Sequence, residues 1–198
     1  RIHLAALAIR EETIGTDHFH TSHTYHNLAV VYRGMEQWPE AEQFYREALR
    51  VKQIHHGEGS AETGRTLSQL GHAIGMQGRF EEASRLHDAA VATTRGLDAE
   101  TGSLVAPMLV RRGDVLRAEG RLTDAETSIR RGIRLWQRSV GTPTPLVPRW
   151  LLRLSEVVGT QGRQEEATQL VAESRALCDG LPLERQRDRC ISAAEAAL

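Results

Sequence analysis

Apolar and polar positions along the chain follow a helical spacing, and the whole pattern returns every 42 residues. A marker alanine stands in each copy, at Ala41, Ala83, Ala125 and Ala167. At 16, 13, 12 and 9 residues before each marker, mostly apolar side chains trace one face of an α-helix. One of these offsets always carries a small residue, which lets a partner helix approach closely: Ala29, Gly71, Gly113 and Ser155. The pattern predicts an all-α protein built from repeated helices.

A turn signal separates two helices within each repeat. Gly78, Gly120 and Gly162 lie five residues before their marker alanines and each is followed by arginine, whereas the first repeat has Glu36 and Gln37. Helix pairs should therefore turn near 36–38, 78–80, 120–122 and 162–164. Proline suits the first turn of a helix, because its missing N–H costs no hydrogen bond there. We therefore expect helices to open at three prolines: Pro39, Pro107 and Pro148.

The motifs inside the repeat resemble a known family. Leu-Ala or Leu-Gly, a bulky residue three positions on, and then Gly-Arg-Phe-Glu-Glu-Ala resemble the tetratricopeptide repeat. The 42-residue period and the phrase "ALAIREETIGTDH" resemble the kinesin-light-chain type and its bacterial relatives. The resemblance implies a right-handed α-solenoid of helix hairpins. It covers nearly the whole chain as one domain: a half-repeat at 1–15, repeats at about 20–57, 62–99, 104–141 and 146–182, and a C-terminal cap helix at 183–198.

Composition and charge narrow the classes of partner. The 198 residues include 25 Lys+Arg and 26 Asp+Glu, for a formal net charge of −1. Binding to nucleic acid or a membrane surface calls for a basic excess, so we expect neither partner. No apolar run approaches the about 18 residues of a membrane span and no signal peptide is evident, so we expect a cytoplasmic location. The chain opens on helix-like sequence without an initiator methionine, which we interpret as a fragment of a longer protein.

Four histidines crowd residues 18–26 and raise the question of a metal site. Two of them, His23 and His26, lie three apart on one helix face and are spaced to share a metal with Asp17. Structural zinc needs four good ligands, and no second carboxylate or cysteine is placed nearby. We therefore expect no metal, and interpret His23 and His26 as residues of a binding groove.

Other reactive chemistry is sparse. No P-loop, no GxSxG nucleophile motif and no HExxH zinc motif occurs, so we expect neither a catalytic residue nor a cofactor. Cys178 and Cys190 are separated by eleven residues. We expect two separate thiols of a cytosolic protein, and a disulfide in an oxidising compartment is the alternative. On this interpretation neither a reductant nor a chelator changes folding stability.

A repeat stack without a catalytic motif predicts a protein–protein interaction scaffold that is not an enzyme and that binds a peptide or partner domain in its concave groove. Two alternatives stay open. The resemblance to bacterial relatives implies a C-terminal regulatory or sensing region of a multidomain signalling enzyme, such as a serine/threonine kinase. The open ends of a solenoid also permit a self-assembly element.

The family resemblance places the groove on the first helix of each repeat, and the period assigns its residues to positions 18, 15, 14, 11 and 8 before each marker alanine. In the fourth repeat these positions are Arg149, Leu152, Arg153, Glu156 and Gly159. The candidate ligand-binding set is His23, His26, Asn27, Arg33, Arg65, Gln69, His72, Arg111, Asp114, Arg117, Arg149 and Arg153. Six arginines face two acids on this surface, the second acid being Glu156. Either these arginines pair with the acids and their neighbours as solvated surface, or they bind an acidic, partly extended segment. We expect the second, with binding weakened by salt and strengthened at pH 6 by histidine protonation.

Overall fold

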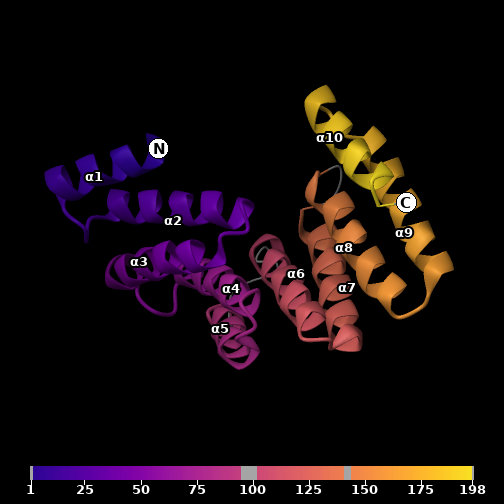
Figure 1. The fold of residues 1–198 in the computed structure, drawn as a ribbon, viewed down its shortest axis with the longest axis horizontal. Coiled ribbons are helices and arrows are strands. Elements are labelled where there is room, and N and C mark those ends of the chain that lie inside the picture. Colours follow the sequence, from indigo (N-terminus) through magenta and orange to yellow (C-terminus); the bar gives the residue numbers. More distant parts are fainter. Residues whose placement is uncertain (1, 95–101, 141–143, 198) are drawn as a thin grey trace. The chain divides into compact units, whose positions relative to one another are not determined.

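Each full repeat folds as a helix hairpin, as the 42-residue period predicts. The computed structural model describes residues 2–94, 102–140 and 144–197, which form ten α-helices and no β-strand (Figure 1). In chain order the helices are α1 (Ile2–Ile14), α2 (Phe19–Gly34), α3 (Trp38–His56), α4 (Ala61–Gly75), α5 (Phe80–Ala92), α6 (Gly102–Ala118), α7 (Leu122–Ser139), α8 (Leu146–Thr160), α9 (Gln164–Asp179) and α10 (Glu184–Glu195). The predicted all-α fold class is confirmed. None of these helices is long and apolar enough to cross a membrane.

The turn inside each hairpin has the backbone conformation that its sequence signal predicts. Gly78, Gly120 and Gly162 have φ angles of 82°, 85° and 84°, in the left-handed region that glycine enters without a steric cost. Glu36 occupies the same repeat position with φ of 57°, so the first repeat makes its turn with a residue that adopts this conformation less readily. The predicted turn positions are confirmed in all four repeats.

The prolines follow the prediction at two of three positions. Pro39 is the second residue of α3 and Pro148 the third residue of α8, both in the first turn. The expectation for Pro107 is wrong, because α6 begins at Gly102 and Pro107 lies inside the helix. A proline there removes one hydrogen bond to the carbonyl four residues earlier. The helix persists because residues on both sides of Pro107, such as Ala106 and Met108, are buried in the core.

The helices group into two compact units, Arg1–Leu97 and Asp98–Leu198, and each is described by itself. In unit 1, α1 packs on α2, and the hairpins α2/α3 and α4/α5 are joined through α3 and α4. In unit 2, α6/α7 and α8/α9 are joined through α7 and α8, and α10 packs on α9. The organisation of both units as one domain stays a prediction.

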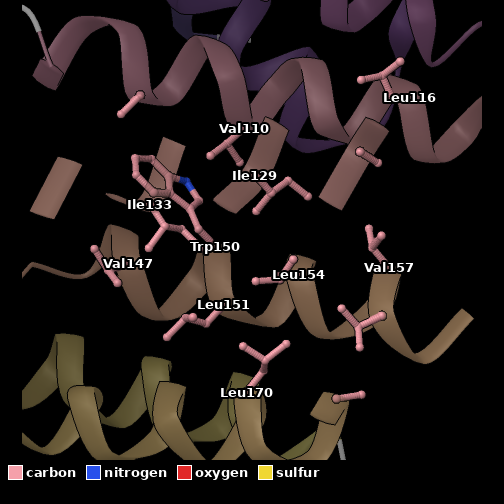
Figure 2. Packing of buried hydrophobic residues seen from close by; sticks show 14 residues of the cluster. Val110, Leu116, Ile129, Ile133, Val147, Trp150, Leu151, Leu154, Val157 and Leu170 are labelled. Carbon is pink, nitrogen blue, oxygen red and sulfur yellow. The ribbon is translucent and has the colours of Figure 1, made fainter. Parts of the chain in front are cut away.

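Apolar side chains from neighbouring helices fill a core in each unit. In unit 1 one core cluster includes Tyr25 and Leu28, and Tyr32 beside it is stacked on Phe44 at 5.4 Å between ring centroids. In unit 2 a mainly aliphatic core cluster includes residues of α6, α7, α8 and α9 (Figure 2). The small residue at a fixed repeat position allows the two helices of a repeat to approach closely, as we predicted. A Cβ atom on Gly113 would lie 2.4 Å from Ile129 and 3.2 Å from the carbonyl oxygen of the marker Ala125.

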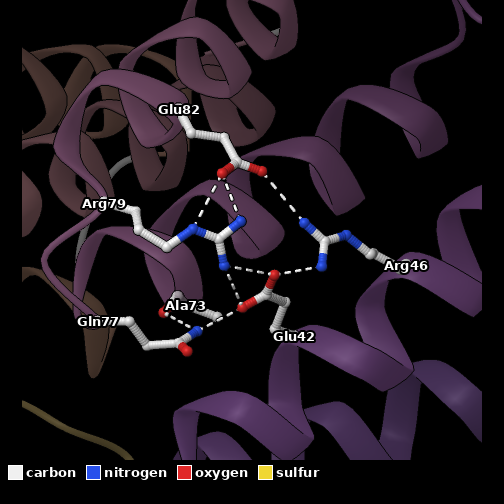
Figure 3. Close-up of polar contacts among 6 residues, drawn as sticks. All are labelled: Glu42, Arg46, Ala73, Gln77, Arg79 and Glu82. Atoms are coloured by element: carbon white, nitrogen blue, oxygen red, sulfur yellow. Dashed lines mark hydrogen bonds and ion pairs between the residues drawn. The ribbon is translucent and has the colours of Figure 1, made fainter.

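A cluster of ion pairs joins the second helices of consecutive repeats within unit 1 (Figure 3). Arg79, which precedes α5, donates from Nη1 to both carboxylate oxygens of Glu42 on α3, at 2.8 and 2.9 Å. Arg46 pairs with the same carboxylate and donates to Glu82 at 3.1 Å. Gln77 adds a hydrogen bond to Glu42 at 2.5 Å. Glu42 thus has partners from both repeats.

The same ion-pair cluster recurs 84 residues later, within unit 2. Arg163 donates to Glu126 at 2.7 Å, and Arg130 donates to Glu126 at 2.9 Å and to Glu166 at 2.5 Å. Arg163 also pairs with Glu166. These residues tie α7 to α9 as the first cluster ties α3 to α5.

The residue at one repeat position of the second helix contacts the first helix of the next repeat. In unit 1 this position holds a base: Arg10 donates to Thr24, and Lys52 donates from Nζ to Thr66 at 3.1 Å. In unit 2 the equivalent residues are aromatic: Trp136 packs edge to face against Trp150 with ring centroids 5.4 Å apart. The contact is therefore polar in unit 1 and apolar in unit 2.

Cys178 on α9 and Cys190 on α10 form a disulfide, with their Cα atoms 5.6 Å apart. Our expectation of two separate thiols is wrong for this structure. Both cysteines are buried and pack with Leu181 and Ile191, so the close packing of α10 on α9 brings the two sulfur atoms together. The periodic pattern that locates the helices says nothing about the distance between two thiols.

Candidate functional site

The histidine-rich segment is held together by ring packing around Phe19 at the start of α2. The nearest rings are those of His23 and His56, at 4.5 and 5.2 Å between centroids, the latter from the end of α3. His18 caps α2 by accepting a hydrogen bond at Nδ1 from the backbone N–H of His20, at 3.1 Å. These histidines therefore have separate structural contacts. Nowhere in the described ranges do three or more His, Cys, Asp or Glu side chains group in a way that would hold a metal ion.

Several candidate residues of unit 1 are packed between helices. His26 packs against the ring of Tyr45 at 5.8 Å, and His72 is buried against Trp38 at 5.5 Å. Gln69 is also buried. The remaining members lie nearer the surface: His23, Asn27 and Arg65 are exposed and Arg33 is half-buried, and Arg65 lies 3.7 Å from Glu62.

The surroundings of His26 and His23 favour the neutral form of both rings. Burial, followed by the positive charges of Lys52 and Arg65, lowers the pKa of His26 to about 3. Burial and Lys52 also lower the pKa of His23. Lys52, the only lysine in the chain, is itself buried between α3 and α4, and burial lowers its pKa. The pKa of His26 argues against the expected gain of charge at pH 6 for that residue, and the expectation for His23 stays a prediction.

In unit 2 the predicted groove residues on α6 and α8 are partly joined in ion pairs. Arg153 on α8 pairs with Asp114 on α6, whose side chain is 10% exposed. Arg117 and Glu156 lie 3.6 Å apart on the same two helices. Both acids of the predicted surface are thus occupied by arginines, which matches the alternative of internal pairing at these positions. Two other members differ in exposure: Arg111 on α6 is half-buried and Arg149 on α8 is exposed.

Two cavities lie along α8 in unit 2. The larger, of about 900 Å³, is bounded by α8, by the first half of α9 and by the end of α10, and it includes four positions that the period assigned to the groove: Arg117, Leu152, Glu156 and Gly159. The smaller, of about 280 Å³, is lined by Pro145, Arg149, Leu152, Gln186, Arg189, Cys190 and Ala193. Leu152 and Ala193 line both cavities, so the two adjoin.

Sequence reasoning missed the contribution of α10 to these cavities. Gln186, Arg189 and Ala193 belong to the predicted C-terminal cap helix and to none of the predicted groove positions, yet they line the space beside α8. The available signal was the charged run "ERQRDR", which places arginines in the first two turns of the last helix. The position of α10 against α8 follows from the disulfide and from the packing of α10 on α9. The repeat period in the sequence predicts neither of these contacts.

Comparison with known proteins agrees with this architecture. A family model described as tetratricopeptide repeat matches residues 1–54 and 104–179, and a second model with the same description matches residues 63–97. The chain belongs to the tetratricopeptide repeat family. No curated protein matches it in sequence.

Solved structures with the same fold include BtubC (BKLC) from P. vanneervenii, with a TM-score of 0.68 and 19% identity over 90% of this chain and 71% of that chain. A putative kinesin light chain from P. anserina, with nearly identical TPR-like repeats, has a TM-score of 0.65 and 17% identity over 91% and 88% of the two chains. The apo form of RapI has a TM-score of 0.68 and 15% identity, and the match covers 89% of this chain and 63% of RapI. At these identities the likeness establishes the fold.

Proposed function

We propose that this protein is a non-catalytic protein–protein interaction scaffold that binds an extended segment of a partner in the groove along α8. Tetratricopeptide repeats in general mediate interactions between proteins, and the family assignment supports this class. The location of the groove is the more specific part of the proposal, and it is supported by the two cavities of unit 2.

The observation that supports the groove is the agreement between the repeat period and the cavities. The period assigns Arg117, Leu152, Glu156 and Gly159 to a ligand surface, and all four line the cavity of about 900 Å³. Its walls combine small side chains with polar ones, so a partner backbone has room to approach and groups to bond. This combination suits an extended peptide segment.

The charge of the groove favours an acidic partner. Arg117, Arg153 and their two acids neutralise one another, whereas Arg149 makes no ion pair with the described residues. Guanidinium groups bond carboxylates bidentately, so the surplus positive charge lies with Arg149 and favours an acidic group. Binding should weaken as salt screens this charge.

A steric variant tests the groove. A Cβ atom added to Gly159 would lie 3.6 Å from the Cβ of Ala167, which is an ordinary contact, so Gly159→Leu should fold and fill the cavity. The probe is a phage library of random twelve-residue peptides, panned on the wild-type chain and on the variant. We expect peptides that bind the wild type and lose at least tenfold in affinity for Gly159→Leu.

The matched control is Gly34→Leu, the same exchange in helix α2 of unit 1, where an added Cβ meets no atom within 4 Å. It should retain the affinity of the wild type. If the library yields no binder, or if the binders ignore Gly159→Leu, the groove is not the binding surface.

The two other functions that the sequence leaves open, a regulatory region of a signalling enzyme and a self-assembly element, stay predictions. The cytoplasmic location also stays a prediction, and the disulfide bears on it, because such bonds persist mainly in oxidising compartments.

A further inference from the structure

The smaller cavity along α8 has an unusual charge balance. Arg149 comes from α8 and Arg189 from α10, and no carboxylate lines the cavity with them. Neither arginine forms an ion pair or hydrogen bond with any other residue in the described part of unit 2. In the larger cavity, by contrast, Arg117 is paired with Glu156. Two positive charges therefore share a concave surface without an internal counter-charge.

The remaining walls are mostly apolar. Pro145, Leu152, Cys190 and Ala193 lie beside the two guanidinium groups, together with the amide of Gln186. Both arginines are exposed, so water screens their charge in part, and the apolar walls exclude water from one side of an anion held here. Planar guanidinium groups also tolerate apolar surroundings better than an ammonium group does.

The disulfide keeps this cavity formed in the absence of a ligand. Cys190 lines the cavity and is bonded to Cys178 on α9, so α10 is held close to α9 by a covalent link. Leu181 and Ile191 pack around the bond. The backbone of α10 that carries Arg189 is therefore positioned before a ligand binds, and preorganisation of this kind favours affinity.

We infer that this cavity is a specificity subsite for a partner segment in which an apolar residue is next to an acidic one. The apolar side chain enters between Leu152 and Ala193, and the carboxylate bridges Arg149 and Arg189. A volume of about 280 Å³ lies below the range of about 300–1,000 Å³ that whole small-molecule ligands occupy, so it suits a single side chain. The inference rests on the proposed groove, because Leu152 and Ala193 line both cavities and a segment in the larger one continues into this one.

The test uses the same peptide library with a second pair of proteins. Arg149→Gln/Arg189→Gln removes both charges of the cavity, and Arg134→Gln/Arg138→Gln on α7 removes two exposed charges that line neither cavity. Peptides selected on the wild type should be enriched in an aliphatic or aromatic residue adjacent to Asp or Glu. The cavity variant should lose the acidic preference, and the α7 variant should keep it. Circular dichroism establishes that both variants fold.

A selected peptide then permits a thermodynamic cycle. We expect its affinity to fall about 10–100-fold when Arg149 and Arg189 become Gln, the range for charge-assisted hydrogen bonds. Changing the peptide Asp or Glu to its amide should cause a similar loss with the wild type and little further loss with the cavity variant. Peptides that bind the groove without an acidic preference, or that lose equal affinity in both backgrounds, would overturn the subsite and leave the groove standing. A library without any binder would overturn both.

Discussion

Arg79 and Glu42 join consecutive repeats through two hydrogen bonds from a single guanidinium nitrogen, at 2.8 and 2.9 Å. The carboxylate is 6% exposed and the guanidinium 43% exposed, so the pair spans the boundary between core and solvent. Burial by itself would raise the pKa of Glu42, but the hydrogen bonds from Arg79 and Gln77 and the charge of Arg46 lower it overall. Arg163 and Glu126 repeat the arrangement in unit 2.

Removing the charge of Glu42 should destabilise unit 1. Glu42→Gln keeps the size of the side chain but replaces charge-assisted hydrogen bonds with neutral ones, and we expect a loss of about 1–3 kcal/mol in the free energy of unfolding. Urea denaturation followed by circular dichroism measures it. Glu126→Gln should show a similar loss, because Glu126 makes the equivalent contacts.

The control for this pair of variants is Glu81→Gln. Glu81 pairs with Arg85 at 3.4 Å, but the two side chains are 87% and 71% exposed. A change within about 0.5 kcal/mol is expected there. If Glu42→Gln were as mild as Glu81→Gln, the buried ion-pair cluster would not contribute to stability.

The sequence predicts the hairpins well because their determinants are local and periodic. The residues at 36, 78, 120 and 162 all take the left-handed turn conformation, and the small residue at Gly113 faces the marker Ala125 as the spacing implies. The predicted start of a helix at Pro107 is wrong, because burial of the surrounding residues outweighs the preference of proline for the first turn of a helix.

The candidate site was only partly predictable, because a period identifies which residues share a face but not which of them pair. Asp114 and Arg153 both occur at groove positions, yet they neutralise each other. Arg189 lies outside the groove positions and still lines a cavity with Arg149. Its placement depends on the disulfide between α9 and α10, which is a tertiary feature.

The edge-to-face contact of Trp136 and Trp150 should be a major source of stability in unit 2. Trp150 is 5% exposed in the core of this unit. Trp150→Ala should cost about 3–5 kcal/mol in unfolding free energy, since it leaves a large cavity. Trp150→Phe keeps an aromatic ring and should cost less. A loss below about 1 kcal/mol for the alanine variant, measured by urea denaturation, would contradict the packing of these two rings.

Reduction of the disulfide should destabilise the end of unit 2. Linking Cys178 to Cys190 restricts a short loop in the unfolded chain, which corresponds to about 2–3 kcal/mol for a loop of this size. We expect a lower melting temperature in the presence of a thiol reductant, together with faster amide hydrogen exchange in α10. A variant with both cysteines changed to alanine should not respond to the reductant. Identical melting of the wild type with and without reductant would contradict a stabilising role of the disulfide.

Acidification should destabilise unit 1 through His26. Burial and the nearby charges of Lys52 and Arg65 lower the pKa of His26 from 6.5 to about 3 in the folded state. The unfolded chain therefore binds a proton at this site near pH 6.5, whereas the folded chain does not bind it until about pH 3. The stabilisation is fully present above pH 6.5 and is lost progressively as the pH falls toward 3. Between pH 7.5 and 5.0 the loss from this site amounts to at most about 2 kcal/mol.

The variant His26→Gln isolates this contribution, because glutamine does not titrate. Its unfolding free energy should differ from that of the wild type by less at pH 5.0 than at pH 7.5, as the wild type loses the stabilisation that depends on a neutral His26. Urea denaturation at the two pH values gives the four free energies, and the proton resonance of the His26 ring reports its pKa directly. A His26 resonance that titrates near pH 6.5 in the folded protein would mean that the ring is open to water. It would also restore the expectation that this histidine gains charge at pH 6 and strengthens the binding of an acidic partner.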